Sequence, residues 1–337
     1  MKKLFFTYLA LIVIGATTLM AQRSSPLIKN LFVYQKEQGE QGVVQYIVKG
    51  IVESTEGENK LNYQYSILSG NATLEQIEKR AILNPLDDNK IVIKLKVTDS
   101  KGTSAFKTIT YSTYKIDPKK LYRDEKTWNL AISQTFINHP AFTFQEHNEK
   151  LPNVLIIGNS ISIGYTPYVQ RELKGKCNVY RIPVNGGDTM LCLRKLDFWL
   201  GDSTWDVIHF NFGLHDLKRL KNNKLDITGK VVNTQEVYAA NLNKIVIKLK
   251  TNTKSKLIWA TTSVVPEGAE GRIKGVEVEY NRIAEKIMKD NQIIIDDQYD
   301  LTSKHPTEQK KENVHFLKEG MERQGKQVAK CISKVLK

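Results

Sequence analysis

Cysteine is scarce in this sequence of 337 residues, which contains only Cys177, Cys192 and Cys331. Three cysteines are too few for the disulfide framework of a small secreted scaffold, and an odd number leaves at least one thiol unpaired. Cys177 and Cys192 could form one disulfide in an oxidising compartment, or they could be small buried apolar residues. None of the three has the spacing of metal ligands, so no metal site is predicted.

Long apolar segments are also scarce, and the clearest one lies at the start. Lys2 and Lys3 precede an apolar stretch at residues 4–14, which is too short to cross a bilayer, and small residues lead to Ala21. This pattern predicts a secretion signal over residues 1–21, with a membrane anchor as the alternative. We therefore expect a periplasmic or secreted protein without stable membrane insertion once the signal is removed.

Acidic residues are fewer than basic ones, 36 against 50, which gives a formal charge of +14. Such a balance can favour nucleic acid, anionic glycans or a membrane surface. Here the lysines are scattered singly among acids, and no basic run alternates with aromatic residues. The pattern indicates a lysine-rich solvated surface and no nucleic-acid partner, while an acidic polysaccharide partner stays open.

The first part of the chain, residues 25–115, has the pattern of β-structure. Apolar and polar residues alternate over 91–97, a turn signal follows at 99–102, and a second strand is expected at 106–111. Several short strands separated by turns predict a small β-sandwich domain. Residues 96–102 resemble the final hairpin of the immunoglobulin-like domains found on secreted enzymes. No catalytic constellation is visible in this domain, which implies a spacer or binding role.

Residues 116–150 lack a clean period and are predicted to be a connector with one helix near 128–136. From residue 151 to 337, apolar strands alternate with amphipathic helices. This alternation predicts a parallel sheet covered on both faces, with ligands bound at the carboxyl ends of the strands. The predicted strands are Val154–Ile157, Val179–Val184, Val207–Phe212, Leu257–Thr261 and Ile293–Ile295.

The most informative segment is Gly158–Ser162, directly after the first of these strands. It is typical of a buried strand that ends abruptly and presents a serine, Ser160, where the next helix begins. The segment is close to the Gly-x-Ser-x-Gly elbow, but Ser162 replaces the last glycine, which argues against an ordinary α/β-hydrolase. A serine in this place is either a nucleophile or a helix N-cap.

Three further segments carry distinctive residues near strand ends or before the last helix. Asn185–Asp188 holds two glycines, whose N–H groups can approach a ligand and point at developing negative charge. Gly213–Asp216 follows the third strand. In Glu312–Phe316, His315 can act as a general base, and Glu312 can fold back to hold its Nδ1–H. Taken alone, each segment is also compatible with a structural loop.

Together the four segments resemble the SGNH hydrolase superfamily, also called the GDSL esterases and lipases, over residues 151–337. The resemblance implies a flavodoxin-like three-layer α/β sandwich with a parallel sheet. It makes Ser160 the nucleophile, and it places a glycine N–H in the oxyanion hole, from Gly187 in preference to Gly186, beside the N–H of Ser160 itself.

Three positions depart from the pattern of the family. Asn159 stands where the first block usually has Asp. His215 stands at the position of the oxyanion-hole Asn, and a neutral His can also donate through one ring nitrogen. Glu312 stands where the last block has Asp. The resemblance thus implies a Ser160–His315–Glu312 triad, with a Ser160–His315 dyad as the alternative.

The resemblance implies ester hydrolysis through an acyl-serine, with no metal or organic cofactor. The Gly-Leu-His-Asp-Leu-Lys form of residues 213–218 resembles a subgroup from secreted bacterial carbohydrate-degrading systems, which implies an acyl ester, often acetyl, on a sugar. Other small esters fit a lipase, lysophospholipase or thioesterase on the same fold. A transferase that moves the acyl group to another sugar and a catalytically impaired glycan-binding protein are further alternatives.

Overall fold

The computed structural model describes most of the chain after the predicted signal. The described residues are 26–35, 46–57, 60–86, 90–112, 116–132, 134–136, 138–222 and 224–337. The predicted signal, residues 1–21, lies outside them. Over the described residues, no helix has both the length and the apolar character needed to cross a membrane.

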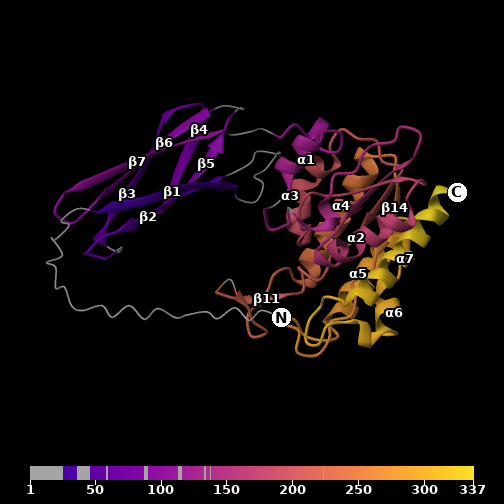
Figure 1. Ribbon diagram of the computed structural model, residues 1–337. Coiled ribbons are helices and arrows are strands. Elements are labelled where there is room, and N and C mark those ends of the chain that lie inside the picture. Colours follow the sequence, from indigo (N-terminus) through magenta and orange to yellow (C-terminus); the bar gives the residue numbers. More distant parts are fainter. Residues whose placement is uncertain are drawn as a thin grey trace, which may run out of the picture.

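The N-terminal part consists of two antiparallel sheets (Figure 1). One sheet has the strand order β1-β2-β5-β4, with bounds Leu27–Gln35, Tyr46–Glu53, Arg80–Pro85 and Ala72–Ile77. The other has the order β3-β6-β7, with bounds Asn62–Ser69, Lys90–Thr98 and Ser104–Ser112. The alternating residues of β6 point inward as predicted, and Ile91, Ile93, Leu95 and Val97 are fully buried.

The two sheets pack face to face, as a β-sandwich requires. Gly50 of β2 lies against the side chain of Leu95 on β6, so closely that a Cβ atom on Gly50 would overlap it. The hydroxyl of Tyr65 on β3 accepts from the N–H of Gly50 at 3.1 Å and donates to the carbonyl of Lys79 at 2.8 Å. These contacts join the two layers through their centre.

The C-terminal part is built on one parallel sheet of five strands, as predicted. Its order is β15-β14-β10-β8-β9, with bounds Ile294–Asp296, Lys256–Ala260, Val207–Phe210, Asn153–Ile157 and Asn178–Arg181. Numbered along the chain, this order is 2-1-3-4-5 read from the β9 edge, the flavodoxin-like arrangement. β9 and β10 end three and two residues earlier than predicted, so those residues belong to the loops above the sheet.

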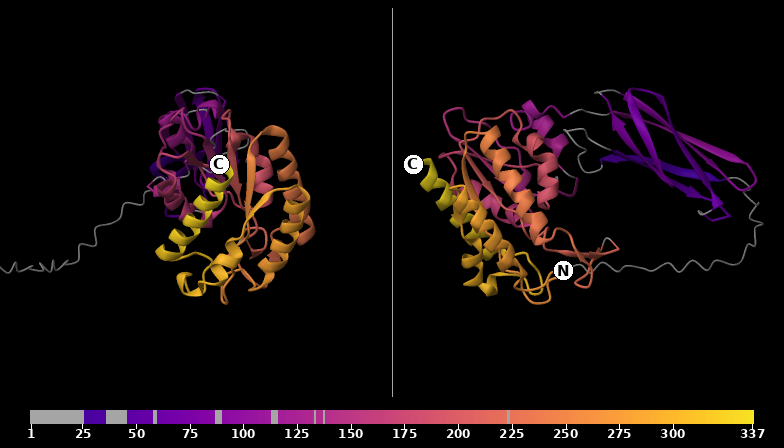
Figure 2. Two further views of the ribbon diagram at one scale, coloured as in Figure 1. Left: turned by 90° about the vertical axis from the view of Figure 1, so that its right-hand side faces the viewer. Right: turned by 180° about the vertical axis from the view of Figure 1, so that it is seen from behind.

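Helices cover both faces of this sheet. One face carries α2 (Ser160–Glu172) and α7 (Lys318–Leu336), which pack against each other. The helices α3 (Thr189–Leu200), α4 (Gln235–Asn252) and α5 (Val276–Asp290) form the opposite layer. Figure 2 shows α7 and α5 on opposite sides of the strands. A short helix, α6 (Gln298–Ser303), follows β15.

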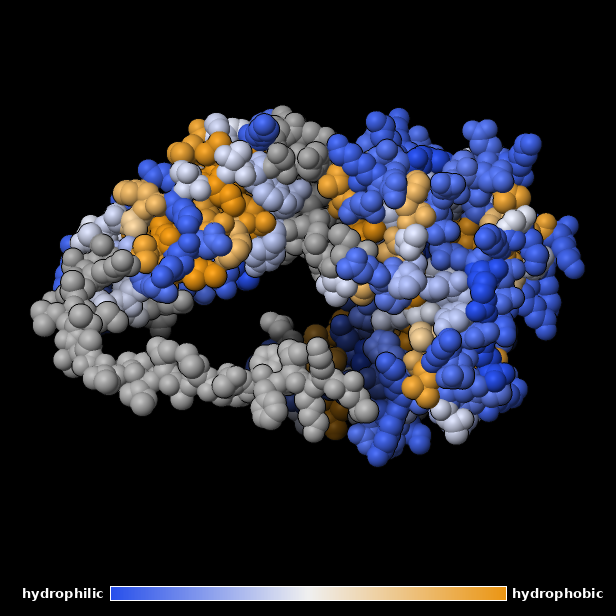
Figure 3. Space-filling view, in the orientation of Figure 1, coloured by the Kyte–Doolittle hydropathy of each residue, from blue (hydrophilic) through white to orange (hydrophobic). Residues whose placement is uncertain are grey.

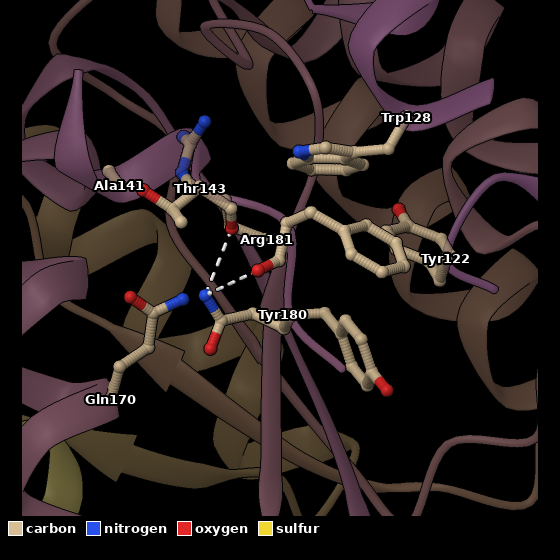
Figure 4. A pocket seen from close by; sticks show the side chains of 9 residues that line it. Tyr122, Trp128, Ala141, Thr143, Gln170, Tyr180 and Arg181 are labelled. Carbon is tan, nitrogen blue, oxygen red and sulfur yellow. Dashed lines mark hydrogen bonds between the residues drawn. The ribbon is translucent and has the colours of Figure 1, made fainter. Parts of the chain in front are cut away.

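The connector before β8 packs on this α/β part. It contains α1 (Glu125–Ala131) and several 3-10 turns. Tyr122 donates its hydroxyl to the carbonyl of Trp199 on α3, and Arg181 at the end of β9 lies 4.3 Å from the ring of Phe142. Connector and sheet enclose a cavity of about 10 Å³, lined by Trp128 and Arg181 among others (Figure 4). This volume holds about one water molecule.

A small three-stranded sheet, which the sequence pattern does not predict, projects from the loop after β10 (Figure 1). Its strands are β11 (Arg219–Lys221), β12 (Lys224–Leu225) and β13 (Lys230–Val231). All three cysteines are free thiols, and Cys177 and Cys192 are buried, so no disulfide joins them. Figure 3 shows hydrophilic side chains over most of the visible face of the α/β part, in keeping with a lysine-rich surface.

Candidate active site

Ser160 is the first residue of α2, at the carboxyl end of β8. The neighbouring β10 lies beside β8, and the chain leaves these two strands in opposite directions, to β9 and to β14. This is the switch point of the sheet, where open α/β folds bind ligands. Asn159, not Ser160, is the N-cap: its side-chain oxygen accepts from the N–H of Ile161 at 3.0 Å. The hydroxyl of Ser160 is therefore not used as a helix cap.

Asn159 has a second role that an aspartate could not fill. Its side chain is fully buried, and its Nδ2 donates to Oδ1 of Asn211 at 3.2 Å. Asn211 follows β10 and donates its own Nδ2 to the carbonyl of Ala260 at 2.7 Å. A chain of two amides thus joins the ends of β8, β10 and β14. An ionised carboxylate only accepts hydrogen bonds, so an aspartate at position 159 could not donate to Oδ1 of Asn211 as Asn159 does.

Ser160 and His315 are brought together although 155 residues separate them. The distance from Ser160 Oγ to His315 Nε2 is 2.8 Å. Nδ1 of the same ring lies 2.7 Å from Oδ1 of Asn313, which also accepts from the backbone N–H of His315 at 3.0 Å. An amide oxygen only accepts, so Nδ1 carries the proton and Nε2 is left as the acceptor for the serine hydroxyl. This is the tautomer that a general base needs.

Glu312 is not the partner of His315, so the predicted Ser160–His315–Glu312 triad is wrong in its third member. Glu312 adopts a left-handed backbone conformation with φ of 53°. Its carboxylate is 63% exposed and lies 3.7 Å from Nζ of Lys311. The tight turn ahead of α7 directs the acid away from the imidazole, and Asn313, one residue later, takes the place predicted for it.

Burial lowers the pKa of His315, and the nearby cations Lys310 and Arg272 lower it further. Each of these causes disfavours the imidazolium. The ring is therefore neutral at pH 7 and can accept the serine proton. It is also available over part of the mildly acidic range, since its pKa is below the ordinary histidine value of about 6.5.

The glycine pair after β9 lies directly against the serine loop. The N–H of Gly186 donates to the carbonyl of Gly158 at 3.0 Å, and a Cβ on Gly186 would lie only 2.8 Å from that oxygen. Gly187 has a φ of 60°, and its N–H donates to Oδ1 of Asn185 at 3.1 Å. The loop thus needs glycine at both positions, and the predicted oxyanion donor, Gly187, now bonds the side chain of Asn185.

His215 faces a cavity of about 310 Å³ that Gly187 also lines. Nζ of Lys218 lies 3.2 Å from Nδ1 of His215. Burial lowers the pKa of His215 to about 3, with further lowering by Lys218, Arg272 and His315. The ring is thus neutral at any pH at which an esterase would be assayed.

Asp216 holds the glycine loop after β9 and the loop of His215 to each other. Its Oδ1 accepts from the backbone N–H of Thr189 at 3.1 Å, from the hydroxyl of Thr189 at 2.6 Å and from Nδ2 of Asn233 at 2.8 Å. Thr189 opens α3 directly after the glycine loop, and Asp216 follows His215. Burial raises the pKa of Asp216 to about 6, although these three hydrogen bonds lower it. The pair therefore fixes Gly187 relative to His215.

The structure thus brings Ser160, His315, Gly187 and His215 to one edge of the sheet and leaves Glu312 outside. Sequence reasoning missed Asn313, Asn211 and Lys218. Within the described ranges, no group of three or more His, Cys, Asp or Glu side chains is arranged to hold a metal ion. A hydroxyl hydrogen-bonded to an oriented neutral imidazole, beside N–H donors, is an arrangement for acyl transfer.

No family model matches the chain, and no curated protein matches it. Solved structures do. A lipase/acylhydrolase from Enterococcus faecalis is 18% identical with a TM-score of 0.47, covering 55% of this chain and 96% of its own. A GDSL-like lipase from Bacteroides thetaiotaomicron is 19% identical with a TM-score of 0.45, covering 63% and 97%. Axe2, an acetylxylan esterase from Geobacillus stearothermophilus, is 16% identical with a TM-score of 0.44, covering 55% and 94%.

Proposed function

We propose that this protein is a serine ester hydrolase of the SGNH type, with Ser160 as the nucleophile and His315 as the general base. The observation that carries the proposal is the 2.8 Å contact between Ser160 Oγ and Nε2 of a histidine whose other nitrogen donates to Asn313. A serine hydroxyl is a weak nucleophile until a positioned base takes its proton. Here the base is neutral, in the required tautomer and within hydrogen-bond distance.

The reaction follows from this geometry. His315 Nε2 takes the hydroxyl proton as Ser160 Oγ attacks the ester carbonyl carbon, and the imidazolium keeps its Nδ1–H on Asn313. The imidazolium then protonates the oxygen of the leaving alcohol as the carbon–oxygen bond breaks, which leaves an acyl-serine. Water attacks this intermediate with His315 again as base, and the carboxylic acid and free Ser160 are released.

The negative oxygen of the tetrahedral intermediates requires hydrogen-bond donors. The backbone N–H of Ser160 lies in the first turn of α2, where helical N–H groups have no partner in the helix. The oxyanion can replace the side chain of Asn185 as the acceptor of the Gly187 N–H, because a side-chain acceptor is easily displaced. His215 supplies the third donor through its ring. Such donors are worth about 10²–10³ in turnover each.

We propose an acyl ester of a carbohydrate, with acetyl as the acyl group, as the substrate. The cavity beside Gly187 and His215 combines the apolar side chains of Leu191 and Trp199 with the charged groups of Asp188, Lys195 and Lys218. Sugar rings present both C–H faces and hydroxyl groups, so this mixture suits a sugar better than a long alkyl chain. The predicted signal over residues 1–21 and an immunoglobulin-like spacer over residues 25–115 fit a secreted or periplasmic enzyme.

The deciding variant is Ser160→Ala. Hydrolysis of p-nitrophenyl acetate should fall by about 10⁴–10⁶, while circular dichroism and the Tm stay close to those of the wild type. The matched control is Ser162→Ala, because Ser162 donates its hydroxyl to the carbonyl of Asn159 at 2.7 Å and does not contact His315. Activity that survives in Ser160→Ala would exclude the proposed nucleophile.

Two further measurements separate the alternatives. A fluorophosphonate should label Ser160 in the wild type and not in Ser160→Ala; failure to label would favour a glycan-binding protein without catalysis. The substrate class is tested by comparing aryl acetates with aryl esters of longer acyl chains. Acetate release from acetylated polysaccharides is then measured. A preference for long chains would indicate a lipase or thioesterase.

A further inference from the structure

The contact between Lys218 and His215 determines which ring nitrogen of the histidine carries its proton. Nζ of Lys218 lies 3.2 Å from Nδ1 of His215. An ammonium group has three donors and no acceptor, so Nδ1 must be the acceptor in this contact. A neutral imidazole with Nδ1 as acceptor carries its single proton on Nε2. In the part of the chain that the structure describes, no hydrogen-bond partner of His215 Nε2 is found.

Burial, together with this contact, keeps the ring from taking a second proton. The pKa of His215 falls to about 3, first through burial and then through the positive charges of Lys218 and Arg272. Protonation would leave two cations, Lys218 and the imidazolium, donor against donor at 3.2 Å. His215 therefore stays neutral in the protonation state in which Nε2–H is its only donor.

We propose that Lys218 is a positioning residue, which holds His215 in the tautomer that donates Nε2–H to the oxyanion of the reaction. The proposal rests on the proposed esterase function for its consequence, but the tautomer itself is a property of the resting protein. Lys218 contacts His215, and it also lines the cavity proposed for the sugar. Its effect on the tautomer is therefore measured with an ester that carries no sugar.

A histidine needs such a partner where an amide would not. The NH₂ group of an asparagine side chain donates whenever it points at the oxyanion. A neutral imidazole donates from one nitrogen only, and its other tautomer would turn a lone pair toward the negative oxygen. That tautomer would replace a hydrogen bond by repulsion.

Several charged groups surround Lys218. Lys218 is half-buried, and burial together with Arg272 lowers its pKa, while the carboxylates of Asp188 and Asp216 oppose that lowering. Arg272 donates its Nε–H to the carbonyl of Leu214 at 3.0 Å, which holds the loop just before His215. The remaining titratable group that acts on His215 is His315, which is neutral when it acts as base.

A double-mutant cycle tests the proposal. With p-nitrophenyl acetate, which carries no sugar, Lys218→Met should lower kcat by about 10- to 100-fold and change KM little. The upper value corresponds to the complete loss of one oxyanion donor. In a His215→Asn background, where the donor no longer depends on a tautomer, Lys218→Met should cost less than about twofold. Lys218→Arg keeps a donor and should recover most of the activity. Lys221→Met, an exposed lysine on β11, is the control.

The tautomer is measured directly by histidine ¹H–¹⁵N correlation spectra, with the His215 signals assigned from the His215→Asn variant. The wild type should show a protonated Nε2 and an unprotonated Nδ1, and Lys218→Met should show a mixture. The proposal is wrong if Lys218→Met keeps the Nε2–H form, or if it costs the same kcat in both backgrounds. If the wild type hydrolyses no ester and Ser160 is not labelled, the proposed function fails, and the spectra still decide the tautomer.

Discussion

The Nδ1–H of His315 donates to the side-chain oxygen of Asn313 over 2.7 Å, so a neutral amide holds the place predicted for a carboxylate. An amide fixes the tautomer of the ring as a carboxylate does. It adds no negative charge, however, and so it does not raise the pKa of His315 against burial and the cations Lys310 and Arg272. The base is thereby weaker and active at lower pH.

Variants at Asn313 should therefore separate orientation from charge. Asn313→Ala should lower kcat by roughly 10- to 100-fold. This is less than the ~10⁴ lost when the histidine of a buried triad is held in the wrong tautomer. The smaller loss is expected because Asn313 is exposed to water. Asn313→Asp keeps the acceptor and should move the acid limb of the pH profile of kcat/KM upward by about one unit. Glu312→Gln is the control and should stay within about twofold. A loss in Glu312→Gln as large as in Asn313→Ala would contradict this assignment.

The cation Lys310 should set part of the pH profile. Since the pKa of His315 lies below its ordinary value and only the neutral ring is a base, kcat/KM should rise with pH, with a midpoint below the ordinary histidine value of about 6.5. Lys310→Met removes one cause of the lowering and should move this limb upward by a few tenths of a unit at low salt, because exposed charges act through water. Lys311→Met is the matched control, since Lys311 pairs with Glu312. Equal profiles for wild type and Lys310→Met would refute the electrostatic account.

Much of the fold was predictable because strands and helices leave periodic patterns. All five strands of the parallel sheet were placed within a few residues, and the apolar run Val154–Ile157 is completely buried. The small sheet β11–β13 was missed because its strands are two or three residues long and none of their residues is buried. Patterns so short carry no period that could be recognised.

The residues that we propose to react were recognisable in the sequence, and those that orient them were not. Ser160 and His315 stand in recognisable segments at a strand end and ahead of a helix. The partner of His315 depends on the φ of 53° at Glu312, which places the side chain of Asn313 beside the ring. No local sequence pattern predicts this backbone conformation. Likewise, the amide chain from Asn159 to Asn211 links segments 52 residues apart.

The amide at position 159 should be required for stability. Asn159→Asp would place a buried carboxylate against Oδ1 of Asn211, and Asn211 cannot turn without losing its bond to Ala260. The expected cost is about 1–3 kcal/mol of unfolding free energy, with a lower Tm. Asn148→Asp is the control, since Asn148 is exposed and only accepts, from the N–H of Lys150 at 3.0 Å, through its side chain. If urea denaturation gives equal stabilities for the two variants, the Asn159–Asn211 bond has no structural value.

His215 should make the folded protein sensitive to acid. Its pKa is about 3 when folded and about 6.5 when unfolded, so between these values the unfolded chain binds more protons, and stability falls as pH falls. Asp216 acts in the opposite direction between about 3.9 and 6, because burial raises its pKa to about 6 in the folded state. Asp216 is present in both proteins when the wild type is compared with His215→Asn, so its effect cancels.

Between pH 7 and 4, the wild type should therefore lose about 3 kcal/mol of stability relative to His215→Asn. Urea denaturation of both proteins at several pH values measures this difference. His147→Asn is the matched control: burial and Arg123 also lower the pKa of His147, but by less than that of His215, so its removal should change the pH dependence far less. Parallel stability curves for wild type and His215→Asn would show that His215 can take a proton in the folded protein, and that neither burial nor Lys218 keeps it neutral.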